Sequence, residues 1–252
     1  MDNATKQTAR TAFPEDADIV TSSDDYARRF AGATGEWFLQ VQQDIILRMM
    51  ECSPGASVLD VGGGHGQVAR PLCSHGYKVA VVGSSEACRA RIDDLVAAEQ
   101  CRFLVGNVIA LPFEDQAFDL VVSFRLLPHC TRWSELVTEL CRVAAREVMV
   151  DYPAVSGINT LAPVFFGAKK QIEGNTRTWR QFKHNEIQGA FEQQGFRLKA
   201  RRGQFFFPMV LHRTIRCRTL SRFMESISEA LGVRTRFGSP VIAAFARQGE
   251  PV

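Results

Sequence analysis

The sequence predicts an α/β fold in which short buried strands alternate with helices. The first indication is a segment of strand character, 57–61, that runs directly into a glycine-rich turn at 62–66. The second is a series of short apolar runs, such as 78–82 and 118–124, typical of strands buried on both faces of a parallel sheet. Because such sheets bind ligands at the carboxyl ends of their strands, the glycine turn marks the expected nucleotide site.

The spacing of the glycines narrows the choice of nucleotide. Gly62, Gly64 and Gly66 follow the pattern G-x-G-x-G, with Asp60 two residues ahead. In the dinucleotide pattern G-x-G-x-x-G the third glycine would fall on Gln67. Glycine lets the backbone turn sharply and lets a ligand approach closely, while open N–H groups of the following helix face that ligand. A carboxylate at the strand end can accept hydrogen bonds from a ligand ammonium group.

This turn resembles the first motif of the class I S-adenosylmethionine-dependent methyltransferases, in particular the small-molecule, ubiquinone-biosynthesis-like group (methyltransferase type 11). The resemblance implies S-adenosylmethionine as cofactor. Its amino acid end would be held by Asp60, Gly62, Gly63, Gly64 and Gly66. It also implies a Rossmann-like doubly wound sheet of seven strands, mostly parallel with an antiparallel last strand, and helices on both faces. Six alternating strands and a hairpin-forming segment at 239–246 agree with that expectation.

Composition and length support a globular protein. The chain has 252 residues, of which 46% are hydrophobic, so it can bury a full core. We expect a mobile arm over 1–25, which is polar and lacks periodicity, and a single domain over 26–252. No apolar run approaches the roughly 20 residues that span a bilayer, and the polar start predicts a cytoplasmic protein. The seven scattered cysteines form no C-x-x-C, so neither a metal site nor disulfides are expected.

The segment 26–50 is predicted to be a helix, interrupted by Gly32 and Gly35. Its first residues resemble the N-terminal segment that covers the cofactor pocket in many small-molecule methyltransferases. The resemblance implies that Tyr26 and Arg29 approach the cofactor. The alternative is a plain helix that packs on the sheet.

The end of the second strand is the clearest departure from the family. There an acidic residue binds both ribose hydroxyls, but this chain has Gly83, Ser84 and Ser85 in that place. The serines or backbone groups would replace the acid. A helix is expected to follow over 86–99.

The third strand and its exit, 101–108, precede a further match to the family. The pattern G-D-A, then L-P-F, then F-D-L-V extends over about twenty residues, with Asn107 in place of the aspartate. The Asn107 amide can accept from an adenine amino group and donate to a ring nitrogen. Val108 is expected to pack near the ring.

The exit of the fourth strand, 118–124, faces both cofactor and acceptor in the family. Phe124 and Arg125 are therefore candidate cofactor contacts, although Arg125 can instead pair with an acid. His129 is the candidate catalytic residue, because an ordinary histidine pKa near 6.5 suits a base that takes a proton from an acceptor hydroxyl. The alternative is a histidine that orders the loop. A helix is expected over 132–144.

The back half contains the expected acceptor side. After a fifth strand at 146–151, Tyr152 contacts the acceptor or packs in the core. The insertions 154–183 and 208–236 stand where the family varies its acceptor cover. A helix is expected over 183–194, a strand over 196–207 and a basic amphipathic segment over 212–231.

Charge is distributed unevenly along the chain. The net charge is +3, but residues 151–252 hold 16 Lys and Arg against 7 Asp and Glu, a balance of +9. Arg213, Arg216, Arg218 and Arg222 follow the aromatic run 205–207. Aromatic bulk beside cations suits an amphiphilic acceptor with an anionic group, or contact with an anionic membrane surface. The alternative is that the phenylalanines are core and the arginines are solvated.

Together these features predict an enzyme that methylates a small-molecule or lipid-like acceptor. The main alternative is a non-catalytic S-adenosylmethionine-binding module, since the ribose and adenine contacts are altered. An RNA methyltransferase is a weaker alternative, because no N-P-P-Y-like tetrad follows the fourth strand. DNA is not an expected partner.

Overall fold

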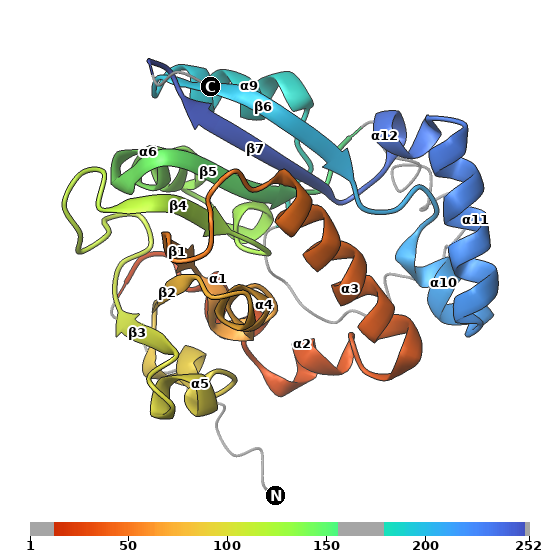
Figure 1. Cartoon of the computed structure of the whole chain (residues 1–252), viewed down its shortest axis with the longest axis horizontal. Helices are drawn as coiled ribbons and strands as arrows, with labels where there is room; N and C mark the ends of the chain where they lie inside the picture. Colours follow the sequence, from red (N-terminus) through yellow and green to blue (C-terminus); the bar gives the residue numbers. More distant parts are fainter. Residues whose placement is uncertain (1–12, 156–178, 250–252) are drawn as a thin grey trace, which may run out of the picture.

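The computed structural model describes residues 13–155 and 179–249, and within them seven strands form one sheet (Figure 1). The strand order is β3-β2-β1-β4-β5-β7-β6. Only β7 runs antiparallel to its neighbours β5 and β6, so the predicted mixed sheet with an antiparallel last strand is confirmed. The strands are β1 (Ser57–Val61), β2 (Lys78–Gly83), β3 (Cys101–Val105), β4 (Phe118–Ser123), β5 (Ala144–Tyr152), β6 (Phe196–Gly203) and β7 (Val241–Arg247).

The strand order places the glycine turn where the chain changes direction across the sheet. From β1 the chain adds β2 and β3 on one side, then returns to add β4 on the other side. β1 therefore pairs in parallel with both β2 and β4. Ligands bind at such a switch point in open α/β sheets, outside the carboxyl ends of the strands. The sheet topology thus brings the exits of β1, β2 and β4 to one edge.

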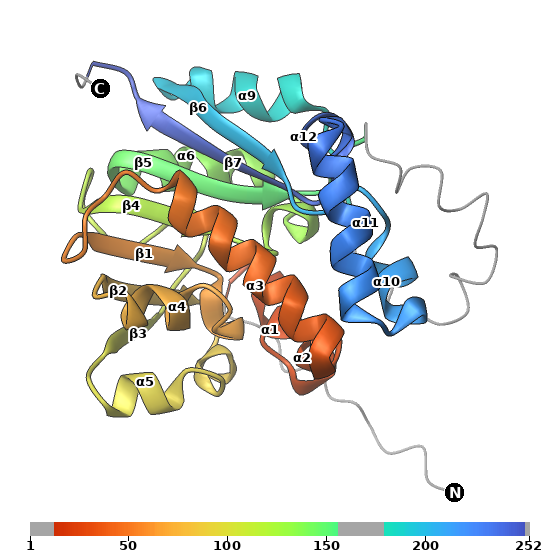
Figure 2. The same cartoon turned by 45° about the vertical axis from the view of Figure 1, so that its right-hand side comes forward.

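Helices cover both faces of the sheet (Figure 2). α3 and α4 pack on one face, and α6 and α9 pack on the other. The helices are α1 (Ala17–Thr21), α2 (Asp24–Arg28), α3 (Gly32–Met49), α4 (Ala69–Ser74), α5 (Asp93–Ala97), α6 (Trp133–Val143), α9 (His184–Glu192), α10 (Met209–Ile215), α11 (Arg218–Ala230) and α12 (Val233–Phe237), with short 3-10 turns η1 (Gly63–His65), η2 (Glu86–Arg89) and η3 (Leu127–His129).

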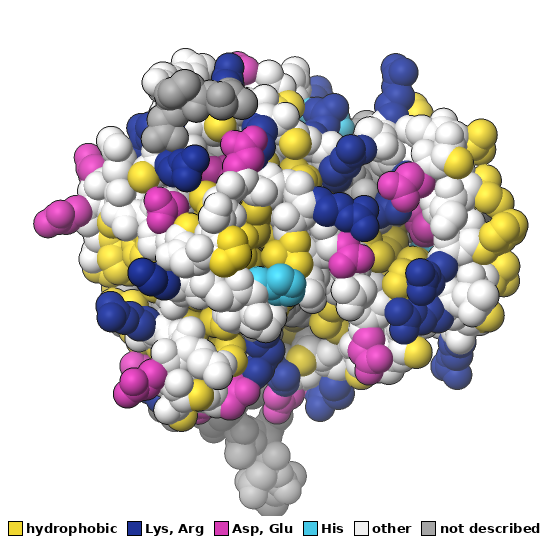
Figure 3. All heavy atoms as spheres, in the orientation of Figure 1, with side chains coloured by type: hydrophobic (Ala, Val, Ile, Leu, Met, Phe, Trp, Pro, Cys, Tyr) yellow, Lys and Arg dark blue, Asp and Glu magenta, His cyan; other side chains and the backbone are white. Residues whose placement is uncertain are grey.

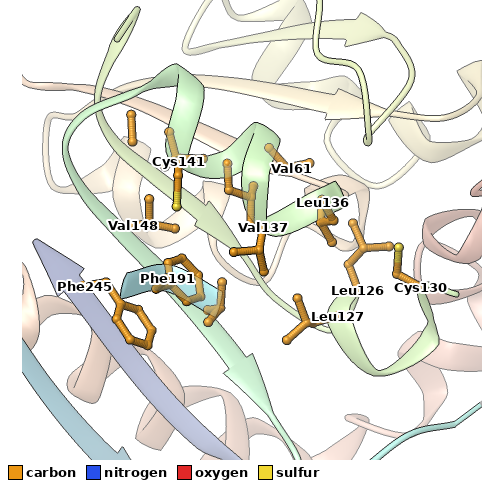
Figure 4. Packing of buried hydrophobic residues seen from close by; sticks show 14 of the residues in the cluster. Val61, Leu126, Leu127, Cys130, Leu136, Val137, Cys141, Val148, Phe191 and Phe245 are labelled. Atoms are coloured by element: carbon orange, nitrogen blue, oxygen red, sulfur yellow. The ribbon is translucent and has the colours of Figure 1, made fainter. Parts of the chain in front are cut away.

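The core follows the alternation of the strands. In β1, Val58 faces the α4 side and Leu59 faces the α6 side, and both are fully buried. Figure 4 shows the α6 side, where Phe191 of α9 stacks on Phe245 of β7 with ring centroids 3.9 Å apart. The cysteines in the described residues are free thiols, most of them buried, and no metal-binding cluster of His, Cys, Asp or Glu occurs there.

The N-terminal segment differs from the expected mobile arm. Within the described residues 13–25 the chain forms α1 and begins α2, and Asp18 and Thr21 of α1 are buried. Apart from Ala17, which packs in the core on the α6 side, the contacts of this segment are polar. Glu15, for example, accepts from the backbone N–H groups of Thr131 and Arg132 at 3.2 and 2.7 Å. A segment that docks through carboxylates has no apolar periodicity, so the sequence pattern could not reveal it. Residues 1–12 lie outside the described part.

Several expected elements are interrupted. The predicted helix 26–50 divides into α2 and α3, because Ala31 is extended and Gly32 has a φ of +73°. The helix 86–99 divides into η2 and α5, and the segment 212–231 divides at Arg216, with a φ of +52°. The strand 196–207 ends at Gly203. Most of the insertion 154–183, including its aromatic and lysine residues at 165–170, lies outside the described residues.

Within the described residues, no helix has the length and apolar character that crossing a bilayer requires.

Candidate functional site

The glycine turn leaves β1 through two left-handed residues. Gly62 has a φ of +75° and Gly66 a φ of +70°, a region that side chains other than glycine rarely adopt. The Gly62 N–H donates to the carbonyl of Val82 at 2.8 Å, and the Gly66 N–H donates to that of Gly63 at 2.9 Å. The turn is therefore fixed both to itself and to β2.

The two glycines between them are required by close packing. A Cβ on Gly63 would lie 2.0 Å from the Asp60 carboxyl carbon, and one on Gly64 would lie 2.2 Å from the carbonyl oxygen of Cys88. Neither distance is compatible with a side chain. The turn thus presses directly on the acid of β1 and on η2.

Asp60 is the electrostatic centre of this site. It is fully buried, and neither carboxylate oxygen has a hydrogen-bond partner among the described residues. Burial raises its pKa to about 8, which the nearby amide of Ala69 offsets only in part. A buried carboxylate without a partner is costly and suits a cationic ligand group.

His65, which no sequence motif indicated as a site residue, joins the turn to the exit of β4. Its Nδ1 accepts from the Gln67 N–H at 3.0 Å, so Nε2 carries the proton and faces the carbonyl of Phe124 at 3.3 Å. Burial, together with Arg125, lowers the pKa of His65 to about 4, so the ring stays neutral. Phe124 contributes this carbonyl, while its ring is buried in the core.

The end of β2 receives a carboxylate from α1. Asp18 accepts from the backbone N–H and the hydroxyl of Ser84 at 2.6 and 2.5 Å, and it is fully buried. Gly83 itself has no room for a side chain, because a Cβ would lie 2.7 Å from Cys88 Cβ. Ser85 instead caps η2 by accepting from the Ala87 N–H. An acid therefore does stand at this strand end, but it comes from another element.

α1 also closes the space over the turn. The position of a Cβ on Gly62 lies 3.5 Å from Asp18 Cβ and 2.9 Å from Leu126 Cδ2. That of a Cβ on Gly64 lies 2.6 Å from Ser22 Oγ. Figure 2 shows α1 beside the carboxyl end of β1.

The exit of β3 carries the predicted adenine contacts. Asn107 Oδ1 accepts from the Ile109 N–H at 3.2 Å, which holds the side chain in the loop. Val108 is fully buried in the core on the α6 side. The Gly106 N–H donates to the carbonyl of Gly83 at 2.9 Å, so this loop is attached to the end of β2.

Arg125 pairs with an acid at the exits of β4 and β5. It has a φ of +64°, and its N–H donates to Asp151 Oδ1 at 2.6 Å. Its guanidinium donates to Gln42 Oε1 of α3 at 2.7 Å and lies 4.7 Å from the Phe30 ring centroid. Burial raises the pKa of Asp151, and Arg125 opposes that rise. The site edge is thereby connected to α3.

The remaining candidates lie farther along this edge. Tyr26 is buried in an aromatic cluster with Phe30, and the exposed Arg29 lies 5.2 Å from the Tyr26 ring centroid. His129 ends η3, is half-buried, and donates its N–H to the carbonyl of Leu126 at 2.9 Å. Tyr152 packs in the core with its hydroxyl 3.0 Å from a ring nitrogen of His184, Nδ1.

Comparison with known proteins finds similarity to methyltransferases, strongest in the central part of the chain. Residues 59–149 match the family described as "Methyltransferase domain". The chain is 29% identical over 110 residues to 24-methylenesterol C-methyltransferase 2 of Arabidopsis thaliana, which covers 41% of this chain and 30% of that protein. It is 26% identical over 219 residues to malonyl-[acyl-carrier protein] O-methyltransferase of Methylococcus capsulatus, with 76% and 77% covered. The match to this chain thus spans about 30% of the length of the sterol methyltransferases among its relatives.

Among solved structures, the fold is similar to magnesium protoporphyrin IX methyltransferase from Synechocystis with bound SAH. The TM-score is 0.61 at 15% identity, and 89% of this chain and 94% of that chain are covered.

The packing around Gly64 predicts a large difference between two glycine substitutions. Gly64→Ala should lower the free energy of unfolding by about 1–3 kcal/mol, because the new methyl group forces the turn and η2 apart. Gly189→Ala in α9 is the matched control, since its Cβ would meet nothing within 4 Å. The control should be neutral or gain up to about 1 kcal/mol. Urea denaturation measures both; equal stabilities would contradict this packing.

The raised pKa of Asp60 predicts a pH-dependent stability difference. Between about pH 4 and pH 8 the folded chain retains a proton on Asp60 that the unfolded chain has lost, so this residue lowers stability as pH rises. Asp60→Asn should therefore gain stability relative to wild type from pH 5 to pH 8. Asp119→Asn is the control: bonds from Ser57 lower the Asp119 pKa, so its pH-dependent contribution is lost only below about pH 4 and its difference from wild type should stay constant from pH 5 to pH 8. A difference for Asp60→Asn that does not change with pH would refute the assignment.

Proposed function

We propose that the chain is a class I S-adenosylmethionine-dependent methyltransferase, to which its fold and its central segment are similar, and that it transfers the methyl group of S-adenosylmethionine to a small-molecule or lipid-like acceptor. The observation that carries the proposal is the buried, unpartnered carboxylate of Asp60 under the glycine turn, at the switch point of the sheet. An ammonium group there would supply the missing charge partner.

The donor set at the strand exits suits the rest of the cofactor. Gly62, Gly63, Gly64 and Gly66 form the wall against which its amino acid part would lie. Asn107 would bind the adenine, with Val108 packing near its ring. When bound, S-adenosylmethionine supplies an electrophilic methyl group on its sulfonium. The protein then has to position the acceptor, exclude water and manage protons.

We further propose that α1 moves away from the turn when the cofactor binds. Asp18 spans the distance between Gly62 and Ser84, which is where the ribose would have to lie. Opening would expose Ser84, whose N–H and hydroxyl then face the ribose together with Ser85. A protein that must open first binds its ligand more weakly by the fraction of molecules that are open.

Asp18→Asn tests this opening. An amide donates where the carboxylate accepted from Ser84, so α1 should be held less firmly and S-adenosylhomocysteine should bind up to about tenfold more tightly. Isothermal titration calorimetry measures the affinity, with the exposed Asp25→Asn of α2 as control. A weaker affinity in a folded variant would mean that Asp18 is itself a cofactor ligand and that α1 stays in place.

His129 is the proposed proton acceptor. As the acceptor oxygen forms its bond to the methyl carbon, the hydroxyl proton would pass to the imidazole, while the bond from methyl to sulfur breaks. His129 follows Leu126, whose side chain borders Gly62, so it belongs to the same edge of the sheet. We propose this role because a neutral imidazole accepts a proton near neutral pH.

His129→Ala should lower turnover by roughly 10²–10⁴-fold and leave the affinity for S-adenosylhomocysteine unchanged. The acid limb of the pH–rate profile should disappear in the variant. His75→Ala, on the exposed end of α4, is the control and should behave like wild type. If turnover is nearly normal, His129 only orders the loop.

The names of several relatives support an amphiphilic acceptor, whereas one is named for glycine, sarcosine and dimethylglycine. The former names refer to a methylenesterol, a malonyl-[acyl-carrier protein] and, for the solved structure, magnesium protoporphyrin IX. We propose that this chain takes a related hydrophobic molecule, meets an anionic membrane surface to obtain it, and has no nucleic acid partner. Free cysteines in the described residues support a cytoplasmic location.

Transfer of label from methyl-labelled S-adenosylmethionine tests the function as a whole. A panel of sterols, prenylated hydroquinones and acyl thioesters should yield one labelled product. A protein that binds S-adenosylhomocysteine and labels nothing would be a non-catalytic binding module. The absence of an acid on β2 and the closed α1 specifically favour that second candidate.

A further inference from the structure

α11 buries its polar side. The residues of this helix that face the protein are Ser221, Glu225 and Ser228. Glu225 accepts from the backbone N–H groups of Phe206 and Phe207 at 2.9 and 3.0 Å. These two bonds, and His212 of α10 at 3.0 Å from the same carboxylate, require the polar side to face inward. The orientation of α11 is therefore set by its hydrogen bonds.

The apolar side of α11 consequently faces solvent. Leu220, Phe223, Ile227 and Leu231 are 47, 63, 45 and 72% exposed. Their spacing of three, four and four residues places them in one row along the helix, which we name the α11 stripe. Figure 3 shows hydrophobic atoms along the edge of the molecule where Figure 1 places α11.

Such a surface is unusual for a helix of a globular protein. Burying one large apolar side chain contributes about 1.5–3 kcal/mol, so a helix normally turns its apolar row inward. Contiguous exposed apolar rows mark interaction surfaces, whereas single exposed residues do not. The stripe therefore indicates a surface that meets an apolar partner.

The charges around the stripe select that partner. Residues 209–237 hold six arginines, no lysine and two glutamates. Glu225 is buried, and Glu229 is paired with Arg234 at 3.0 Å. The exposed Arg216 precedes α11 and the exposed Arg236 follows it, so each end of the stripe has a nearby cation in the chain.

The arginines that the sequence suggested as a basic surface do not lie together beside the α11 stripe. Arg218 and Arg222 line a groove between α3 and α11, together with Asp44. Arg213 lies against α3, 5.7 Å from the Phe38 ring centroid. Phe205 is fully buried in the aromatic cluster, whereas Phe206 and Phe207 are half-buried, so only the first phenylalanine of the run is core. The most exposed large apolar residues of this part of the chain are those of the α11 stripe.

We infer that the α11 stripe inserts into the interfacial layer of an anionic bilayer, with α11 lying in the membrane plane. The inference rests on the amphiphilic acceptor proposed above and names the surface that would reach it. At 13 residues, α11 is about 20 Å long, which suits the interface and is too short to span. A second copy is a poorer partner, because a symmetric contact would bring two arginine-rich segments together.

The helix that carries the stripe is also connected to α3. His212 of α10 lies 3.0 Å from Glu225 of α11 and packs edge-on against Trp37 of α3, with ring centroids 5.2 Å apart. α3 in turn supplies Gln42 to Arg125 at the site edge. A membrane contact at α11 is therefore joined to the candidate site through buried side chains.

Vesicle flotation with the full chain tests the inference. Wild type should bind phosphatidylglycerol–phosphatidylcholine vesicles, bind pure phosphatidylcholine at least tenfold less, and be released as salt rises. Phe223→Ser combined with Ile227→Ser should reduce binding at least tenfold. Arg216→Gln with Arg236→Gln should reduce the salt dependence. Val105→Ser, at an exposed valine of β3, is the matched control and should bind normally.

Three outcomes would overturn the inference. The first is that wild type does not bind vesicles, and the second is that the serine double variant binds them as well as wild type does. The third is that light scattering finds dimers of every form of the protein except the serine double variant, which is monomeric. Circular dichroism and thermal melting verify that each variant is folded. The affinity for S-adenosylhomocysteine, measured separately, should be the same in all variants. If wild type binds vesicles but does not bind S-adenosylhomocysteine, the proposed function is wrong and the inferred membrane-binding surface is still supported.

Discussion

The structure depends on the close approach of the glycine turn to its neighbours. Gly63 lies on the Asp60 carboxylate and Gly64 on the backbone of η2, with no space for a side chain at either position. This contact buries the carboxylate of Asp60 without giving it a partner. The folded chain therefore retains an unfavourable buried acid at the switch point of its sheet. Such local strain is typical of binding sites, where a ligand completes the electrostatics.

Hydrogen bonds extend from this turn across the edge of the sheet. His65 connects it to β4, and Arg125 connects β4 to Asp151 of β5 and to α3. Asp18 connects β2 to α1. Each connection involves a buried ionisable or polar group, whose loss would leave its partner unsatisfied. The site edge is thus held by polar contacts, while the two faces of the sheet are held by apolar packing.

Polar docking also explains the two least expected elements. α1 is held by Asp18 and the segment before it by Glu15, and α11 is held by Glu225, so three carboxylates accept from backbone N–H groups of distant segments. In α1 this arrangement closes the candidate cofactor site. In α11 it leaves the apolar row outside, where it is available to a partner. α1 thus lies where the cofactor is proposed to enter, and α11 carries the surface proposed to give access to a hydrophobic acceptor.

The sequence by itself determined the sheet, the glycine turn and most strand exits. These features are local: apolar runs define the strands, and the left-handed positions at Gly62 and Gly66 require glycine. Only the tertiary structure decided what meets the turn. Asp18 reaches Ser84 across 66 residues, and no spacing within either segment encodes that contact. The orientation of α11 likewise depends on the N–H groups of Phe206 and Phe207, in the loop before α10. The amphipathic pattern of the helix alone therefore could not predict which of its sides is buried.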